Sequence, residues 1–591
     1  MVDTRDCLRK LPQFGGIILG LILVACAGCF GQCHFSDRSP GAITYTFDPV
    51  VSDQSLSFRI TIEFRGASSG RTKLWLPSEW AGQQHDERAV TELQALSPRT
   101  FIDDAKSPAE RLLRFPPNSQ VRLSYVLVKD WKGKLDSSTR FRVDLSPLYF
   151  HFVGTTALVR PQINPYRTVD VHFDWQKLPA SWTLATSVAT DDRCQSFHGY
   201  WRDALNSLFV GGDYRIHHTT INGNPLNFAI RGQWQFTDEN WVDHARKIVD
   251  FERTFWRDDN FPYFLITLTP LDQDHGSSGG TALTNAFMQH LSRLDTLTST
   301  TLGILAHETF HEWNPYRIGL PKGAEYSVSW FFEGFTRYYQ NVMLLRAGLM
   351  DFPGYVSSVN ELLQKYQLTE GTHVTLEDFI RRHSANHAVL DQLDQRRGAV
   401  IALWLDATIR RRSRNQASLD NVMFDLAAQE AARRRAHKAE PVALTNKRLF
   451  QTIGQRISQK SLDQLRRYVE QGGVVPIPEN ALGPCVQSDG QTMTRFDLGF
   501  DGSRLSSGDT VVAGVVPYTE AYRAGLRDGQ ELMGWSIHNG DTSKEVRLKI
   551  KEPDGERTIT YFPRGAKVTV QQFQLDSDKY THDPRACQAM N

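Results

Sequence analysis

The chain of 591 residues has no excess of charge of either sign. Its 67 lysine and arginine residues are balanced by 66 aspartate and glutamate residues, so no overall field favours nucleic acid or an acidic lipid surface. The basic runs at 410–412 and 433–435 have no aromatic residues interleaved with them, which is typical of solvated helix faces and not of a nucleic-acid track. We therefore expect no nucleic-acid partner.

Cysteine is scarce in the body of the chain. Four of the seven cysteines lie in or beside the N-terminal segment, namely Cys7, Cys26, Cys29 and Cys33. The other three, Cys194, Cys485 and Cys587, have no C-x-x-C spacing, so they do not indicate a structural zinc site. In an oxidising compartment, a disulfide between Cys485 and Cys587 would close the last domain.

The N-terminal segment has the pattern of an export signal. Arg5, Arg9 and Lys10 precede an uncharged run at 14–25 that is rich in Gly, Ile and Leu. A positive region followed by a short apolar run is typical of a secretory signal. We assign 1–33 to this signal and expect an exported protein of the periplasm or cell envelope.

The end of this signal is open to three interpretations. Leu-Val-Ala-Cys at 23–26 resembles a bacterial lipobox, in which Cys26 is lipidated and becomes the mature N-terminus. Residues 25–27 also fit an ordinary A-x-A cleavage site. The uncharged run continues to Ser36, which is long enough for an uncleaved membrane anchor. We expect a lipoprotein anchored to the membrane through Cys26.

Hydrophobic patterning predicts a multidomain α+β protein. Alternation at 56–64 indicates half-buried strands, and we expect an antiparallel β-sandwich-like domain at 41–176. Helical periodicity dominates from about Asp238, so we place a mainly helical catalytic domain at 177–473. Short strands return at 485–591, after a proline-containing linker.

The segment His307-Glu308-Thr309-Phe310-His311 carries the clearest chemistry. In a helix, residues four apart lie on one face, so His307 and His311 can bind one metal ion. Packing positions at 302, 305, 306, 309 and 313 support the helix, which makes surface histidines the weaker interpretation. Glu308 lies about 100° around the helix, where it can take a proton from water at the open metal position.

A third ligand is expected in the segment Trp330-Phe331-Phe332-Glu333-Gly334. Catalytic zinc usually has three protein ligands and keeps a fourth position for water. The aromatic residues before Glu333 indicate a buried helix start, and a buried carboxylate needs a partner. We assign His307, His311 and Glu333 to one zinc ion per chain, with Glu308 as the general base.

Two glycine-containing segments are candidate binding elements. The turn at 276–280 ends in Gly279 and Gly280, and no Gly-Lys-Ser/Thr follows to make it a phosphate loop. We expect its backbone to lie along an extended substrate. The segment Leu498-Gly499-Phe500 could bind a peptide at a strand edge or hold a C-terminal carboxylate. It could equally be a turn of a small barrel without a ligand.

These segments resemble the glycyl aminopeptidase family of gluzincin metallopeptidases. The resemblance lies in 307–314, Arg317, 330–339 and the PDZ-like segments at 498–500 and 524–526. It implies a β-rich N-terminal domain, a thermolysin-like catalytic domain and a C-terminal PDZ domain. It also implies the zinc ligands and general base named above, and peptide substrates.

The chain departs from the family pattern at two places. The glycine pair is usually followed by a Glu that holds the substrate's amino terminus, but here Thr-Ala-Leu follows, and Asp272 or Asp274 would have to replace it. Where the family has a tyrosine that stabilises the oxyanion, this chain has Gln395. Losing such a donor typically lowers the rate by about 10²- to 10³-fold, unless the amide of Gln395 takes its place.

We therefore expect an exported zinc metallopeptidase, and the resemblance implies an aminopeptidase. One alternative is an endopeptidase with altered specificity. Another is a membrane-anchored protein whose protease domain is weak or silent and whose PDZ-like domain binds C-terminal peptides.

Overall fold

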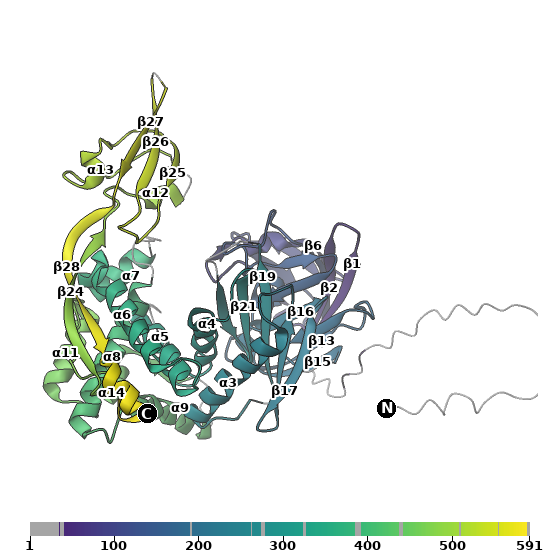
Figure 1. The fold of residues 1–591 in the computed structure, drawn as a ribbon. Coiled ribbons are helices and arrows are strands. Elements are labelled where there is room, and N and C mark those ends of the chain that lie inside the picture. The colour runs from purple at the N-terminus through teal and green to yellow at the C-terminus, as the bar shows by residue number, and fades with distance from the viewer. Residues whose placement is uncertain are drawn as a thin grey trace, which may run out of the picture.

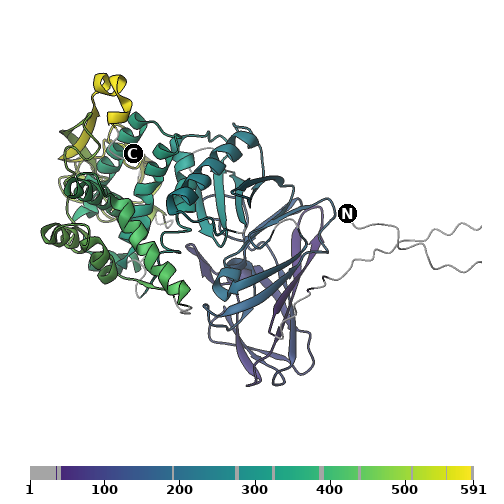
Figure 2. The same ribbon diagram turned by 90° about the horizontal axis from the view of Figure 1, so that it is seen from below.

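The computed structural model describes residues 33, 35, 41–189, 192–261, 263–272, 278–322, 327–384, 392–436, 441–506, 510–553 and 555–587. Its many sheets and helices confirm a multidomain α+β protein. The N-terminal strands lie on one side of the molecule and most helices on the other, with a central sheet between them (Figure 1). The view from below shows the same separation (Figure 2).

Two sheets enclose the N-terminal core. The first has the order β15-β13-β1-β2-β9-β6 and comprises β1 (Ile43–Val51), β2 (Leu56–Arg65), β6 (Val90–Ala95), β9 (Gln120–Leu127), β13 (Thr168–Asp174) and β15 (Cys194–Tyr200). The second has the order β10-β11-β16-β14 and comprises β10 (Asp144–Ser146), β11 (Tyr149–Val153), β14 (Thr183–Thr186) and β16 (Leu208–Gly212). Alternate residues of β2 are buried, as its period-two pattern predicts. Phe58 on β2 meets Phe150 of the second sheet edge to face, with ring centroids 5.1 Å apart.

This N-terminal architecture differs from the expected one in two respects. The first sheet is mixed and not wholly antiparallel, because β1 and β13 pair in parallel. The boundary expected after residue 176 lies between β13 and β15, which pair with each other from Thr168 to Asp174. The N-terminal sheets therefore continue past that boundary to Gly212. A further small sheet has the order β12-β3-β8-β7 and comprises β3 (Arg71–Trp75), β7 (Phe101–Asp104), β8 (Glu110–Arg114) and β12 (Arg160–Pro161).

The central sheet carries the expected substrate-binding glycines. Its order is β17-β18-β19-β21-β20, with β17 (Arg215–Ile221), β18 (Asn224–Ile230), β19 (Phe264–Leu271), β20 (Gly279–Leu283) and β21 (Ala286–Ser292). Helix α3 (Asp238–Trp256) packs on it through buried side chains such as Trp241 and Ile248. Gly279 and Gly280 lie in the edge strand β20 and not in a turn. Residues 276 and 277 of the expected turn lie outside the described residues.

The helical part shares one core with the central sheet. Its helices include α4 (Ser299–Phe310), α5 (Ser329–Arg346), α6 (Phe352–Gln367), α7 (Leu376–Ser384), α8 (Leu393–Ser413), α9 (Leu419–Arg435), α10 (Asn446–Gly454) and α11 (Gln459–Glu470). The expected linker contributes Val475 and Ile477 to this core, so it is packed and not free. A long ribbon of β24 (Val486–Phe496) and β28 (Arg564–Leu575) then lies against α6, where Asn360 exchanges two hydrogen bonds with the backbone of Phe573.

The ribbon ends in a small unit with its own core, at the top of Figure 1. Its antiparallel sheet comprises β25 (Leu532–Ser536), β26 (Val546–Glu552) and β27 (Gly555–Tyr561). The last domain expected at 485–591 thus has two parts that pack in different cores. The ribbon packs on the helical part through Phe573, whereas only the segment between the two ribbon strands has a separate core.

Two disulfides join distant parts of the chain. Cys485 pairs with Cys587, as the sequence predicts for an oxidising compartment. Cys33 pairs with Cys194, so the last residue that we assigned to the signal belongs to the folded protein. Cys26 and the rest of the predicted signal lie outside the described residues. None of the helices in the described part of the chain has the length and hydrophobicity of a membrane span.

Candidate metal centre and substrate cleft

Helix α4 carries three of the predicted site residues. It begins with a capping box, in which Thr298 and Thr301 bond each other's backbone N–H groups. Its buried face includes Leu305 and Phe310, which belong to the main core. Because this face is fixed, His307 and Glu308, which lie between these two residues, are held at the cleft, and His311 follows as the C-cap residue.

Helix α5 is held close to both α4 and α8. The side chain of Asn314 donates to the carbonyl oxygen of Phe332 and to Thr336, which ties the end of α4 to α5. At the crossing with α8, a Cβ added to Gly398 would lie 1.8 Å from the carbonyl oxygen of Trp330. Only glycine permits this approach, which brings the start of α8 beside Glu333.

The structure brings the three predicted ligands together. Nε2 of His307 lies 3.2 Å from Nε2 of His311 and 3.4 Å from Oε2 of Glu333. Nε2 of His311 lies 3.8 Å from Oε1 of Glu333. Zinc bonds of about 2.0–2.1 Å in a tetrahedral site place neighbouring ligand atoms about 3.3 Å apart. Among the described residues, this is the one group of three or more His, Cys, Asp or Glu side chains whose geometry could hold a metal.

Hydrogen bonds orient the ligand atoms. Nδ1 of His311 lies 2.8 Å from the carbonyl oxygen of Asn314; a carbonyl only accepts, so Nδ1 carries the proton and Nε2 is left with its lone pair toward Glu333. Burial raises the pKa of Glu333, but the two neighbouring histidines and the hydrogen bond from Gln395 outweigh it and lower that pKa to about 2. The ligand set is thus two imidazole nitrogens and an ionised carboxylate, which suits zinc.

Glu308 is fixed by the edge strand. Its Oε2 accepts a hydrogen bond of 3.1 Å from the backbone N–H of Ala282 on β20. Both residues line a cleft of about 570 Å³, together with Gly280, Thr281, His307, His311, Glu333, Gln395, Tyr166, Arg202, Pro315, Tyr316, Leu320, Pro321 and Phe332. This volume is within the range of small-molecule and peptide sites. The metal group and an open strand edge therefore share one cleft.

Two of the predicted substrate-binding residues, Gly280 and Gln395, lie on opposite sides of this cleft. Gly280 lines it from β20, and a Cβ there would lie 2.3 Å from the ring of Phe287. A Cβ on Gly279 would lie 2.6 Å from the guanidinium of Arg140. Close packing beneath the strand thus explains both glycines. Gln395 lines the opposite side and donates a hydrogen bond of 3.0 Å to Glu333.

No replacement for the missing amino-terminal acid is visible in the described part of the cleft. Asp272 accepts from the backbone N–H of Leu135 and pairs with Arg293, and it does not line the cleft. Asp274 lies outside the described residues. Of the described residues that line the cleft, only Glu308 and Glu333 carry carboxylates.

Several cleft residues had no signal in the sequence. Tyr166 and Arg202 come from the N-terminal part, more than 100 residues before the metal motif. Ala282 acts through its backbone, which its side chain does not reveal. Arg317, which belongs to the family motif, pairs with Asp258 and does not line the cleft.

The predicted peptide-binding loop of the last domain is occupied by internal contacts. The backbone N–H of Gly499 donates to Asp497, and its carbonyl oxygen accepts from the N–H of Val516. The carbonyl oxygen of Leu498 accepts from the hydroxyl of Tyr561, and Phe500 is buried in the small core. A PDZ function for Leu498, Gly499 and Phe500 therefore stays a prediction.

Fold and site together describe a metallopeptidase. Residues 300–395, which include all three candidate ligands and Glu308, match the M61 glycyl aminopeptidase family. This match confirms the resemblance for the segments at 307–314 and 330–339, whereas the PDZ-like segments lie outside it. The chain is thus a zinc metallopeptidase, and its residues 300–395 are similar to this family.

One solved structure supports the fold. An aminopeptidase N family protein from Idiomarina loihiensis is similar over 90% of this chain and 98% of its own, with a TM-score of 0.68 and 16% identity. An M1 zinc metallopeptidase from Deinococcus radiodurans covers 76% of this chain and 99% of its own, with a TM-score of 0.46 and 13% identity. The comparison with curated proteins gave no match.

Proposed function

We propose that this protein is an aminopeptidase that hydrolyses peptide bonds with zinc and with Glu308 as general base. The observation that carries the proposal is the single cleft in which His307, His311 and Glu333 face Glu308. The name of the matching family, glycyl aminopeptidase, supports the choice of an aminopeptidase.

The residues of the cleft suit this reaction. A zinc ion held by the three ligands would supply a Lewis acid that polarises the peptide carbonyl and makes water easier to deprotonate. Ala282 holds Oε2 of Glu308, so Oε1 can take the proton of the attacking water and later give it to the leaving amine. Gln395 fixes the orientation of Glu333.

The edge strand supplies a place for the substrate backbone. Among the described residues, strand β20 pairs with β21 alone, so its other edge is open to a further strand except where the N–H of Ala282 is bonded to Glu308. An extended peptide can pair with such an edge. Since Gly280, Thr281 and Ala282 line the cleft, a peptide paired there would pass beside the metal group.

An endopeptidase is the second candidate, and one observation favours it. The described lining of the cleft has no acid beyond Glu308 and Glu333 to hold a substrate ammonium group. A charge-assisted hydrogen bond of that kind contributes about 1.5–3 kcal/mol. Without it, a free amino terminus has no preference for this cleft over the interior of a peptide.

One digestion distinguishes these functions. Zinc-loaded full chain, with Cys33 retained, is incubated with a peptide library in two forms, with free and with acetylated amino termini, and the products are identified by mass spectrometry. Release of single residues from the free form alone supports the aminopeptidase. Internal cuts in both forms support the endopeptidase. If neither form is cut more than by the Glu308→Gln variant, the peptidase proposal is wrong, and a peptide-binding protein with a silent protease domain becomes the better explanation.

We further propose that the protein is exported and lipidated at Cys26. The support is the signal pattern together with the two disulfides, which persist in oxidising compartments. Mass spectrometry of the N-terminal peptide from membranes should show a modified Cys26. An unmodified residue 26 inside a longer N-terminal peptide would exclude lipidation there.

A further inference from the structure

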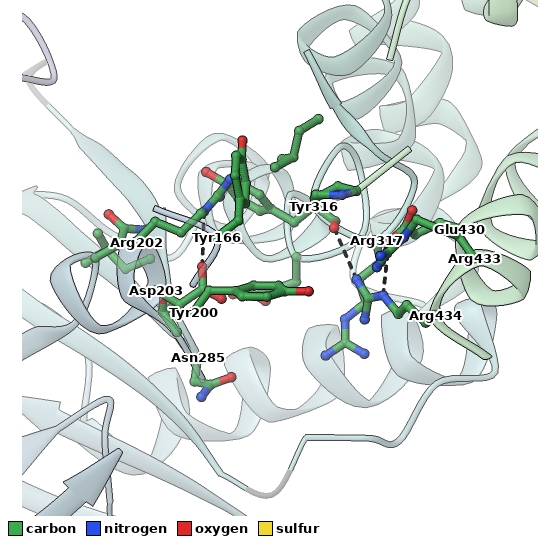
Figure 3. Close-up of a pocket in the computed structure, with 16 residues that line it drawn as sticks. Tyr166, Tyr200, Arg202, Asp203, Asn285, Tyr316, Arg317, Glu430, Arg433 and Arg434 are labelled. Carbon is green, nitrogen blue, oxygen red and sulfur yellow. Dashed lines mark hydrogen bonds and ion pairs between the residues drawn. The ribbon is translucent and has the colours of Figure 1, made fainter. Parts of the chain in front are cut away.

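A second cavity adjoins the substrate cleft. Figure 3 shows the residues that line it. It has a volume of about 190 Å³ and shares four lining residues with the cleft, namely Tyr166, Arg202, Tyr316 and Leu320. At about 30 Å³ per water molecule, it has room for about six waters. It is therefore too small for a whole peptide but large enough for one side chain of a peptide that lies in the cleft.

The cavity is rich in arginine. Four arginines line it, namely Arg202, Arg317, Arg433 and Arg434, against the three acids Asp203, Glu312 and Glu430. Two of the arginines, Arg433 and Arg434, share the single carboxylate of Glu430, at 2.7 and 3.2 Å. The carboxylate partner of Arg317, Asp258, lies outside the lining. The lining of the cavity therefore has more arginine side chains than acidic side chains.

Arg202 lies where the cavity joins the cleft. Its guanidinium carbon is 5.8 Å from the ring centre of Tyr166 and 5.9 Å from that of Tyr316. Aromatic faces attract a guanidinium and restrict its orientation. The helix that carries it, α2 (Trp201–Leu205), is anchored by the buried Trp201. Arg202 is thus held in place by its surroundings before any ligand binds.

Part of this guanidinium is open to a ligand. Nε of Arg202 donates to Asp203 over 3.2 Å, and this is the only side-chain hydrogen bond of Arg202 among the described residues. The side chain of Arg202 is 30% exposed to solvent. Among the described residues that line the cleft, Arg202 is the only basic side chain of the lysine or arginine type. A guanidinium with unused N–H groups matches the two oxygens of a carboxylate.

We propose that Arg202 and the adjoining cavity form a subsite for a carboxylate of the peptide substrate. The carboxylate belongs to an acidic side chain or to the C-terminus, and both present the same two oxygens to Arg202. This inference rests on the proposed peptidase function and adds a substrate class to it. The structure assigns specificity to a residue of the N-terminal part, outside the family motifs.

The test uses matched peptides that differ by one group. Each peptide with one Glu is compared with its Gln counterpart, and each free C-terminus with its amide, in kcat/KM of the zinc-loaded full chain. We expect a preference of about 10-fold or more for one acidic form, carried mainly by KM. Arg202→Gln should remove the preference, whereas Arg202→Lys should retain part of it. Arg167→Gln, which removes an exposed arginine that lines neither cavity, should keep it.

A binding measurement separates this inference from the peptidase proposal. Calorimetry with the Glu308→Gln protein should show tighter binding of the acidic peptide, and the difference should disappear when Arg202→Gln is added. Equal affinity for acidic and neutral peptides would overturn the subsite, even if both are hydrolysed. Absence of hydrolysis by the wild type, with acid-selective binding intact, would instead overturn only the peptidase function. Retained selectivity in a folded Arg202→Gln variant would also overturn the subsite.

Discussion

The side-chain amide of Gln395 donates a hydrogen bond of 3.0 Å to Oε2 of Glu333. The family resemblance implies a tyrosine at the position of Gln395, and the structure places the Gln395 amide beside the metal group. A hydrogen bond to a ligating carboxylate fixes its orientation. Helix α8 can reach Glu333 because Gly398 lies against α5.

Replacing Gln395 should weaken zinc binding. In Gln395→Ala the carboxylate of Glu333 loses a donor, and loss of such an outer partner typically lowers metal affinity by about 10- to 100-fold. Competition with a chromogenic chelator measures the change. Gln364→Ala, an exposed glutamine on α6, is the matched control and should bind zinc as the wild type does. Unchanged affinity in Gln395→Ala would show that this hydrogen bond does not position the ligand.

Removing the general base should separate chemistry from metal binding. Glu308→Gln keeps the side-chain size but cannot accept a proton, so we expect turnover to fall by about 10²- to 10⁴-fold. The zinc content measured by mass spectrometry should stay at the wild-type level, because Glu308 is not among the three ligands. In contrast, His311→Ala should lose both zinc and turnover. A Glu308→Gln protein with wild-type turnover would refute the proposed mechanism.

The contact between α5 and α8 should not tolerate a methyl group. A Cβ in Gly398→Ala would lie 1.8 Å from a backbone oxygen of α5, so the helices must separate. We expect the free energy of unfolding to fall by about 1–3 kcal/mol, the usual cost of overpacking, and zinc affinity to fall with it. Denaturant unfolding provides the measurement. Gly534→Ala, where nothing lies within 4 Å of the new Cβ, is the control.

The disulfide between Cys485 and Cys587 should stabilise the oxidised protein. Cys485 and Cys587 are 102 residues apart, and removing a link of this kind typically costs about 2–5 kcal/mol. The double variant Cys485→Ser/Cys587→Ser should therefore unfold at lower denaturant concentration. Reductant should destabilise the wild type more than the double variant, which keeps only the Cys33 link. Equal responses to reductant would contradict a stabilising role.

Acid should destabilise the protein through His151. Burial lowers the pKa of His151 from 6.5 to about 4, so the neutral imidazole is the form that the fold accepts. Its contribution is complete above pH 6.5 and is lost as the pH falls toward 4. At about 1.4 kcal/mol per pH unit, the loss between pH 6.5 and 5 is about 2 kcal/mol. Unfolding curves of His151→Gln should show a smaller pH dependence over this range.

A matched histidine controls for the pH effect. His198 is exposed and pairs with Asp170 on the surface. The variant His198→Gln is the matched control, because it removes an exposed imidazole in place of the buried one. If His151→Gln and the wild type lose stability equally between pH 7 and 5, another group is responsible.

Local sequence determined the elements of the metal group. The four-residue spacing of His307 and His311 requires only one helix, and the capping residues and apolar stripe of α4 act within that helix. The aromatic segment before Glu333 likewise belongs to one buried helix. Strands such as β2 followed their period-two pattern closely. Each of these features depends on neighbours within a few turns or residues.

Only the tertiary structure decided what surrounds the metal group. Arg202 and Tyr166 reach the cleft because the N-terminal sheets fold against the central one, and no local pattern encodes a contact across more than 100 residues. The parallel pairing of β1 with β13 and the Cys33–Cys194 link have the same origin. Secondary structure arises from short-range periodicity, whereas partners distant in sequence are chosen by the burial of whole surfaces. The sequence by itself thus determined the chemistry, and the packing of the domains decided the walls of the substrate cleft.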